Sequence, residues 1–423
     1  MRLATLLLAA AVGCAHAQSS AATGATGGTG TLGARVENDT TSLLGEGRIA
    51  RLPEAQREAW RQYVETSRRL HRLDVDSMAR ELKRLGRDRM TKAPDARHSI
   101  SIEDAVRAAA RLPDDSLRTL VATVLSFQTP SGGWSKHVDY AQGPRRTGEA
   151  YFSETDQWSY TPTLDNDATV AQLRLLHGAW DRTRDETYRA AFLRGIDYLL
   201  AAQMPNGCWP QVFPLQGGYH DAATFNDDAI VNVLALLRDV IGTGTHGNPF
   251  VPAPVLARVT AAEARGVGCI LDSQVTVRGV RTVWGQQHDP LTLLPTSARS
   301  YELAGLSGRE SASIMRFLMD VPEPSDAVVA AVHAAADWFK AHQLTGYDYD
   351  YLKGRTENPS AAPIWARLTE VETDRPIFAN RDGVKLYDWN QLTDRRSGYA
   401  WYGREPATAL KEYAKWSRKY PRK

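Results

Sequence analysis

A seven-residue motif recurs along the chain at a constant spacing. Gln128-Thr-Pro-Ser-Gly-Gly-Trp134 returns as Gln203-Met-Pro-Asn-Gly-Cys-Trp209, and a longer copy runs from Gln274 to Trp284, so that the tryptophans stand 75 residues apart in both intervals. Each copy follows a stretch with helical periodicity, at 115–127, 189–202 and 259–273. A period in this range marks repeated units that bury one shared core. The motif therefore predicts three helical hairpins over 100–345, arranged as a partial toroid with the tryptophans packed inside.

Three helix starts are visible near the repeats, and two of them carry the same kind of acidic cluster. L-D-N-D-A-T-V (164–170) and F-N-D-D-A-I-V-N-V (225–233) each place one Asn and two Asp before an apolar run, whereas Ser307-Gly-Arg-Glu310 fits a capping box. Asn and Asp are favoured caps, and acids suit the positive end of the helix dipole, so capping alone could explain each cluster. Because calcium requires several hard oxygen ligands in one place, the repeated cluster favours a calcium site as the alternative.

The chain changes character after about residue 350. Residues 365–370 and 375–378 alternate apolar and polar side chains, and Asp382-Gly383 signals a turn. We expect a short β-hairpin ending at Asp388, followed by a terminal helix over 405–419. The predicted fold class is mainly α: an (α/α) toroid of three helical hairpins with a small β element near the C-terminal end.

Arginines concentrate on this β element. A solvated basic face would explain Arg367, Arg375 and Arg381. A clamp for carboxylate or phosphate groups is the alternative, because guanidinium groups bind such anions bidentately. Arg299 lies further upstream, and a salt bridge to Glu302 is the simplest role for it.

The first 34 residues indicate an export signal and a linker. Residues 1–17 contain a basic start, an apolar run and an A-x-A cleavage site, whereas 18–34 is rich in Ser, Ala, Thr and Gly. We therefore expect a secreted or periplasmic protein, or a lipoprotein if the weak lipobox that ends at Cys14 is used. In an oxidising compartment, Cys208 and Cys269 could form a disulfide or remain buried thiols.

The remaining chain divides into two predicted domains. Residues 35–95 form a charged helical layer, and 96–423 form the toroid domain. The apolar stripe of the helical layer consists of Trp60, Tyr63, Leu70, Leu73 and Met78. A net charge of only +2 gives no electrostatic case for nucleic acid or an anionic membrane, and no apolar run is long enough to span a bilayer. We expect a monomer.

Five segments of the chain stand in the order found in one known enzyme family. They are F-Q-T-P-S-G-G-W-S-K (127–136), L-D-N-D-A-T (164–169), G-G-Y-H-D-A-A-T-F-N-D-D-A (217–229), S-A-R-S-Y-E-L-A-G-L-S-G-R-E-S (297–311) and W-A-R…R-P-I-F-A-N-R-D-G (365–383). Over about 100–405 the chain closely resembles the pectate lyases of polysaccharide lyase family 10. The resemblance implies a mainly α-helical toroid with a long substrate cleft, calcium dependence and β-elimination of polygalacturonate.

The resemblance also implies which acids hold the metal. Asp165 matches the family's calcium-site aspartate, Asn166 matches its neighbour, and Asp227 matches a second active-site acid. We therefore expect Asp165 and Asp227 to bind calcium, with Asn166 placed among the substrate-binding residues.

The basic residues complete the implied site. Arg299 matches the arginine proposed as the catalytic base, although the variable length of the segment after it makes this alignment the weakest. Arg367 and Arg381 match arginines that bind substrate carboxylates. We add Lys136, the last residue of the 127–136 segment, to the expected substrate-binding residues. A guanidinium acts as a base only in its neutral form. We expect nearby calcium and arginines to lower the pKa of Arg299, because like charge disfavours its protonated form.

Two other classes of function remain open at this point. One is a non-catalytic, calcium-dependent pectin-binding protein. The other is a different toroid enzyme: a glycoside hydrolase that uses Asp165 and Asp227 as its acid and base, or a terpene cyclase type. The chain has D-N-D and N-D-D where terpene cyclases carry a D-x-D-D acid, and its arginines do not suit an apolar cavity. The product separates lyase from hydrolase, because only a lyase leaves an unsaturated, ultraviolet-absorbing end.

Overall fold

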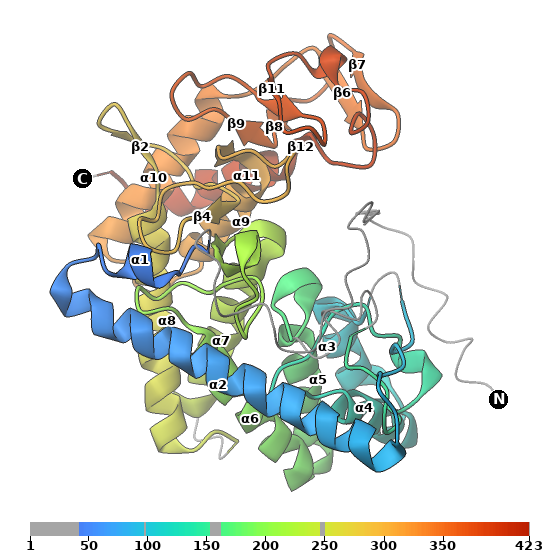
Figure 1. The fold of residues 1–423 in the computed structure, drawn as a ribbon. Helices are drawn as coiled ribbons and strands as arrows, with labels where there is room; N and C mark the ends of the chain where they lie inside the picture. Colours follow the sequence, from blue (N-terminus) through green and yellow to red (C-terminus); the bar gives the residue numbers. More distant parts are fainter. Residues whose placement is uncertain (1–41, 97–98, 153–161, 246–249, 423) are drawn as a thin grey trace. The chain divides into compact units, whose positions relative to one another are not determined.

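The computed structural model describes residues 42–96, 99–152, 162–245 and 250–422 (Figure 1). The predicted signal peptide, Cys14 and the linker lie outside the described residues. The chain forms two compact units, and each is described separately. The first contains Gly28–Asp221 and Asn232–Arg265, and the second contains Ala222–Val231 and Gly266–Lys423. Helices make up 51% of the structure, so the predicted mainly α class is confirmed.

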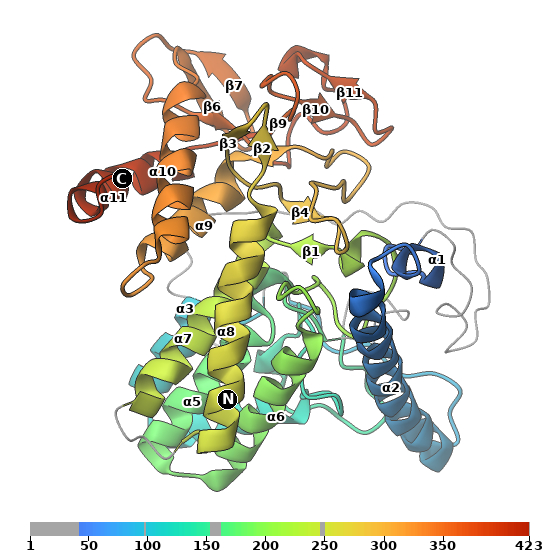
Figure 2. The same ribbon diagram turned by 90° about the vertical axis from the view of Figure 1, so that its left-hand side faces the viewer.

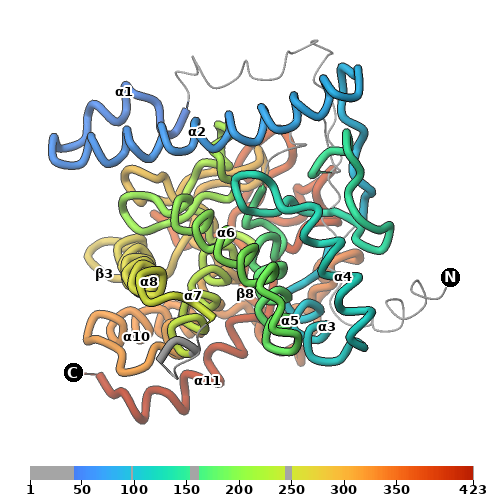
Figure 3. The backbone as a smooth tube through the Cα atoms, turned by 90° about the horizontal axis from the view of Figure 1, so that it is seen from below, coloured from blue at the N-terminus to red at the C-terminus, as the bar shows by residue number. Residues whose placement is uncertain are grey.

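The first unit is built from helices. Its elements are α1 (Glu46–Ile49), α2 (Glu54–Leu85), α3 (Ile102–Arg111), α4 (Asp114–Ser126), η1 (Tyr140–Gln142), η3 (Asp165–Asp167), α5 (Val170–Thr183), α6 (Glu186–Ala202), η4 (Gly218–Asp221), most of α7 (Ala229–Thr245) and the first part of α8 (Ala253–Ser273). Helix α5 packs against α3 on one side and against α6 on the other (Figure 3). Local caps fix several helix starts, because Ser101 accepts from the Asp104 amide before α3 and Asp185 accepts from the Thr187 amide before α6.

Helix α2 is a single helix of 32 residues that ends at Gly86 in the left-handed conformation. Its buried stripe contains Trp60, Tyr63, Leu70 and Met78 as predicted. The prediction for Leu73 is wrong, because this side chain is 42% exposed and the next residue, Asp74, is buried instead. Asp74 faces inward because its carboxylate accepts hydrogen bonds from the amide (2.7 Å) and the hydroxyl (2.7 Å) of Ser131 in the first repeat motif.

Burial raises the pKa of Asp74 to about 7 in spite of these hydrogen bonds. In the unfolded chain this carboxyl ionises near its ordinary value, so the folded state binds its proton more tightly between about pH 4 and pH 7. Stability should therefore fall across that window as pH rises, by a few kcal/mol at most. Replacing Asp74 by Asn should flatten the fall, as measured by chemical denaturation at pH 5 and pH 8.

Asp76 on the same helix is exposed and provides the matched control, because Asp76→Asn should leave the pH dependence unchanged. Burial also raises the pKa of Asp221 to about 7, so part of the slope should remain in the Asp74→Asn variant. Identical slopes for Asp74→Asn and the parent protein would contradict the assignment.

The three copies of the repeat motif make the same hydrogen bonds. Each motif glutamine donates its Nε2 to a carbonyl within its own turn and to a carbonyl of a later helix: Gln128 to Gly132 and Ala191, Gln203 to Gly207 and Ala262, and Gln274 to Thr282 and Ala331. Each motif tryptophan is fully buried and donates its Nε1 to a carbonyl of the preceding helix: Trp134 to Val124, Trp209 to Leu199, and Trp284 to Ile270. The predicted repeat and the core position of its tryptophans are thus confirmed at atomic detail.

The third copy departs from the other two at one position. In the first two copies an arginine three residues beyond the accepting carbonyl, Arg194 or Arg265, donates to the glutamine Oε1. In the third copy the corresponding residue is Ala334, and Gln274 Oε1 has no hydrogen-bond partner among the described residues. Ala334 instead lines a hollow of about 820 Å³ beside α10 (Asp326–Ala341).

The described part of the second unit combines three complete α-helices, parts of two more and two short 3-10 helices with short antiparallel strand pairs (Figure 2). Its helical elements are η5 (Asn226–Asp228), the start of α7, the end of α8, α9 (Gly308–Met319), α10, η6 (Trp389–Gln391) and α11 (Glu405–Lys419). The strand pairs are β1 (Ala223–Thr224) with β4 (Gln287–His288), β2 (Thr276–Val277) with β3 (Val280–Arg281), β5 (Leu306–Ser307) with β9 (Leu368–Thr369), β6 (Tyr347–Asp350) with β7 (Gly354–Glu357), β8 (Trp365–Ala366) with β12 (Tyr402–Gly403), and β10 (Phe378–Ala379) with β11 (Lys385–Leu386). Helix α9 contacts both α10 and α11.

The predicted β-hairpin is correct at its turn, and the segment before it also pairs with the neighbouring one. Strands β10 and β11 pair across the Asp382-Gly383 turn, where Gly383 has a φ of +75°. Residues 368–370 pair with 375–377 through the antiparallel Thr369–Pro376 bridge. Residues 365–369 also pair with β12 and β5, so the β element draws on distant parts of the chain as well. Aromatic side chains such as Phe378, Tyr399 and Trp401 fill its core. Among the described helices, none is long and apolar enough to cross a membrane.

Candidate active site

The acidic cluster of the first unit lies in the strained turn before α5. Asn166, Asp167 and Thr169 all have positive φ, which is uncommon for a β-branched residue such as Thr169. Thr169 is held there by its buried hydroxyl, which accepts from the Trp134 amide (3.0 Å) and lies within hydrogen-bond distance of two carbonyls. The repeat motif therefore fixes the conformation of this acidic turn.

The side chains of this turn have separate partners. Lys136 Nζ lies 2.6 Å from Oδ2 of Asp165, whose side chain is almost fully buried. Asp167 accepts from the amide of Ile102, the first residue of α3, and from the side-chain amide of Asn232. The N-cap residue of α5, Thr169, makes no side-chain cap hydrogen bond, so capping of α5 does not explain the acids. The structure brings the predicted residues Lys136, Asp165 and Asn166 together.

The acidic cluster of the second unit has the same backbone signature. Asp227 (φ 50°) and Asp228 (φ 60°) occupy the left-handed region, as Asn166 (φ 50°) and Asp167 (φ 65°) do in the first unit. By conformation, therefore, Asp227 corresponds to Asn166, and Asp165 corresponds to Asn226. One Asp227 oxygen accepts from Nη1 of Arg309 (3.2 Å) and the other from the side-chain amide of Asn226 (2.8 Å).

Arg367 lies in a buried ion pair beside this cluster. The residue is 4% exposed, and its Nη2 donates to Oε1 of Glu310 (2.8 Å) and to Oδ1 of Asn226 (3.0 Å). Burial would raise the pKa of Glu310, but the positive charges of Arg367 and Arg309 outweigh it and lower that pKa. Glu310 also faces Ser307, which caps α9 as the predicted capping box requires. Arg367 is thus anchored mainly by protein groups, and its role as a substrate ligand stays a prediction.

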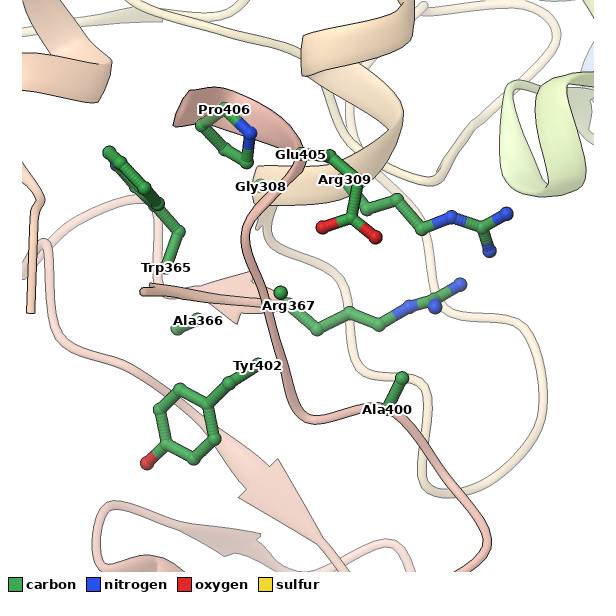
Figure 4. Close-up of a pocket in the computed structure, with 10 residues that line it drawn as sticks. Gly308, Arg309, Trp365, Ala366, Arg367, Ala400, Tyr402, Glu405 and Pro406 are labelled. Carbon is green, nitrogen blue, oxygen red and sulfur yellow. The ribbon is translucent and has the colours of Figure 1, made fainter. Parts of the chain in front are cut away.

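A small hollow of about 10 Å³, room for about one water molecule, separates α9 from β8 and β12. Figure 4 shows the side chains of Arg309 and Arg367 running side by side along it, with the carboxylate of Glu405 next to the Arg309 stem. Two neighbouring guanidinium groups repel each other, and Asp227 and Glu310 supply the compensating charges.

Arg299 is held by Glu302, the partner suggested by the simplest interpretation of the sequence. Its Nε and Nη2 donate to the two carboxylate oxygens at 2.7 Å and 2.6 Å. Burial alone would lower the pKa of Arg299, but the hydrogen bonds and charge of Glu302 raise it above the ordinary arginine value. Glu302 therefore opposes the expected lowering of this pKa, and the role of Arg299 as a base stays a prediction.

Arg381 lies near the same segment at the protein surface. Its side chain is 39% exposed, its Nη1 is 3.6 Å from Asp394, and its carbonyl accepts from the hydroxyl of Ser300, next to Arg299. The second unit thus contains Asp227, Arg299, Arg367 and Arg381.

Sequence reasoning missed two charged residues of this region. Glu310 was recognised only as a helix cap, and Arg309 was not recognised at all. The adjacent capping box signalled Glu310, but the contact of Arg309 with Asp227 joins positions 82 residues apart and has no local signal.

Comparisons with known proteins identify the family. Residues 128–410 match the family model described as pectic acid lyase. The family 10 polysaccharide lyase from Cellvibrio cellulosa matches with 31% identity and a TM-score of 0.65, over 74% of this chain and 94% of that one. An aspartate-to-alanine mutant of a family 10 lyase from the same organism, in complex with trigalacturonic acid, matches with 31% identity and a TM-score of 0.63, over 75% and 98% of the two chains. A search of curated proteins found no match. The chain therefore belongs to the pectic acid lyase family and is a pectate lyase of the (α/α) toroid class.

Proposed function

We propose that this enzyme cleaves polygalacturonate, the de-esterified form of pectin, by calcium-dependent anti β-elimination and releases unsaturated oligogalacturonates. The observation that supports this most is the similarity to a lyase structure that contains trigalacturonic acid. Positions 165, 166, 227, 299, 367 and 381 carry the acids, the amide and the arginines that such a reaction needs. The enzyme acts as an exported monomer.

The acids of both units fit a hard cation. Asp165 and Asp227 each offer carboxylate oxygens, the ligand type that calcium prefers. Among the described residues, no three His, Cys, Asp or Glu side chains form a metal site on their own. Calcium needs six to eight oxygens, so Asp165 and Asp227 would hold it only together with further oxygens from substrate carboxylates or water. When bound, calcium neutralises the substrate carboxylate and so acidifies the neighbouring C5–H.

The residues of this chain divide the chemistry between them. Polygalacturonate carries one carboxylate on every sugar, and Arg381 and Lys136 attract these groups. Arg367 adds a fixed positive charge to the site. Arg299, in its neutral form, takes the proton from C5, and the released electron pair forms the C4–C5 double bond. The C4–O bond breaks with its electron pair on the leaving oxygen, which takes a proton from water. Negative charge that develops on the carboxylate during proton removal is stabilised by the fixed cations, which is usually the largest catalytic term.

Removing calcium should abolish this activity. Incubation with a calcium chelator is expected to lower the rate of ultraviolet-absorbing product formation by about two orders of magnitude or more, because the developing charge loses its main counter-ion. Added calcium should restore the rate. Magnesium should not, because it demands a smaller octahedral shell.

The same assay tests the class of reaction. Survival of activity after thorough chelation would show that calcium is not required. Cleavage that yields only saturated reducing ends would show hydrolysis by a carboxylate pair instead.

A further inference from the structure

Arg309 forms a salt bridge with Asp227, the carboxylate that is predicted to bind calcium. Its Nη1 is 3.2 Å from Oδ1 of Asp227, and both side chains are mostly buried, at 20% and 10% exposure. The other oxygen of Asp227 accepts from the Asn226 amide. Both oxygens of this acid are therefore engaged by donors of the protein itself.

The surroundings of Arg309 explain why it stays on Asp227. Arg309 is the second residue of α9, where the positive end of the helix dipole disfavours a cation. Arg367 lies alongside and repels it (Figure 4). Glu310, Asp227 and Asp228 offset both effects, so that the pKa of Arg309 is raised despite burial. A calcium ion bound to Asp227 would place Arg309 next to three positive groups that repel it: the calcium ion, Arg367 and the N-terminus of α9.

We propose that Arg309 and calcium compete for Asp227, so that calcium binds firmly only when a substrate carboxylate takes Arg309 away from this acid. This inference rests on the calcium dependence proposed above. Polygalacturonate supplies the required anion, since each of its sugars carries a carboxylate. Substrate and calcium then strengthen each other's binding, and by linkage the effect is equal in both directions.

Arg309→Gln tests the competition without any measurement of catalysis. In calorimetric titrations with calcium chloride and no substrate, Arg309→Gln should bind calcium about tenfold more tightly than the parent protein. Arg309→Lys keeps the positive charge and should bind as weakly as the parent. The matched control is Arg404→Gln in the same unit, since Arg404 pairs with the exposed Asp348 and should not affect calcium.

A second titration tests the role of the substrate carboxylate. Saturating galacturonate, a monomer that has no glycosidic bond to cleave, should tighten calcium binding by the parent protein and have little effect on Arg309→Gln. Equal calcium affinities for the parent and Arg309→Gln, including no binding by either, overturn the proposal. Lyase activity that survives a chelator would separately overturn the calcium dependence on which it rests. Thermal unfolding of each variant confirms that it is folded before titration.

Discussion

Replacing Arg299 by alanine is expected to lower kcat on polygalacturonate by about 10²- to 10⁴-fold, the usual contribution of a positioned base. Binding of the substrate depends mainly on other cations, so KM should change much less. Arg299→Lys keeps the charge but not the geometry, and should recover only part of the rate. Arg404→Ala is a suitable control, because Arg404 pairs with the exposed Asp348.

The pH profile separates a base from a structural arginine. Glu302 raises the pKa of Arg299, so the neutral fraction is small and the rate should climb toward alkaline pH. Glu302→Gln removes the negative charge of that carboxylate and should lower the pKa of Arg299. The rise of the rate should then occur at lower pH. If Arg299→Ala turns over normally at saturating substrate, Arg299 only pairs with Glu302, and hydroxide or water removes the proton.

Replacing Arg367 by methionine should lower the free energy of unfolding by about 3–5 kcal/mol, because Glu310 would remain charged and unpaired in the interior. Arg367→Met combined with Glu310→Gln should recover part of the loss, since no unpaired charge is left. Arg316 and Glu412 form an exposed pair on the same helix, and Arg316→Met should cost at most about 1 kcal/mol. Denaturant unfolding followed by tryptophan fluorescence measures all three.

The same pair has a defined pH dependence. The folded-state pKa of Glu310 is lowered, so its contribution to stability is present above the pKa of an unfolded glutamate and is lost as the pH falls through the folded value. This acid-side loss should disappear in the Arg367→Met/Glu310→Gln variant. An Arg367→Met protein as stable as the parent would show that the pair contributes nothing.

The repeat was predictable because its information is local. The motif glutamine bonds a carbonyl within its own turn, and the motif tryptophan reaches back to the helix that precedes it, so the residues that form each unit stand close together in the sequence. The constant interval between tryptophans then identified the helical hairpins. The turn at Asp382-Gly383 was predictable for the same reason.

The rest depends on contacts between distant positions. Residues 368–370 pair with the nearby 375–377 as their alternation suggests. However, β8 also pairs with β12 and β9 with β5, and no property of the segment itself identifies those distant partners. Apolar periodicity placed Leu73 inside α2, but the double hydrogen bond to Ser131 makes Asp74 the buried residue. Arg309 was missed because its partner Asp227 lies far away in the sequence.

The contacts of α2 set a lower limit on a working fragment of this enzyme. Tyr63 donates to the carbonyl of Ala202, Ser67 accepts from the amide of Leu215, and Asp74 accepts from Ser131. The family match begins only at residue 128, well after this helix. A protein truncated at that boundary would lose the hydrogen bonds that α2 side chains make to three buried backbone groups. Each lost bond should lower the free energy of unfolding by about 1–3 kcal/mol. For expression, domain swapping or fusion, the catalytic module of this lyase therefore begins no later than Glu54.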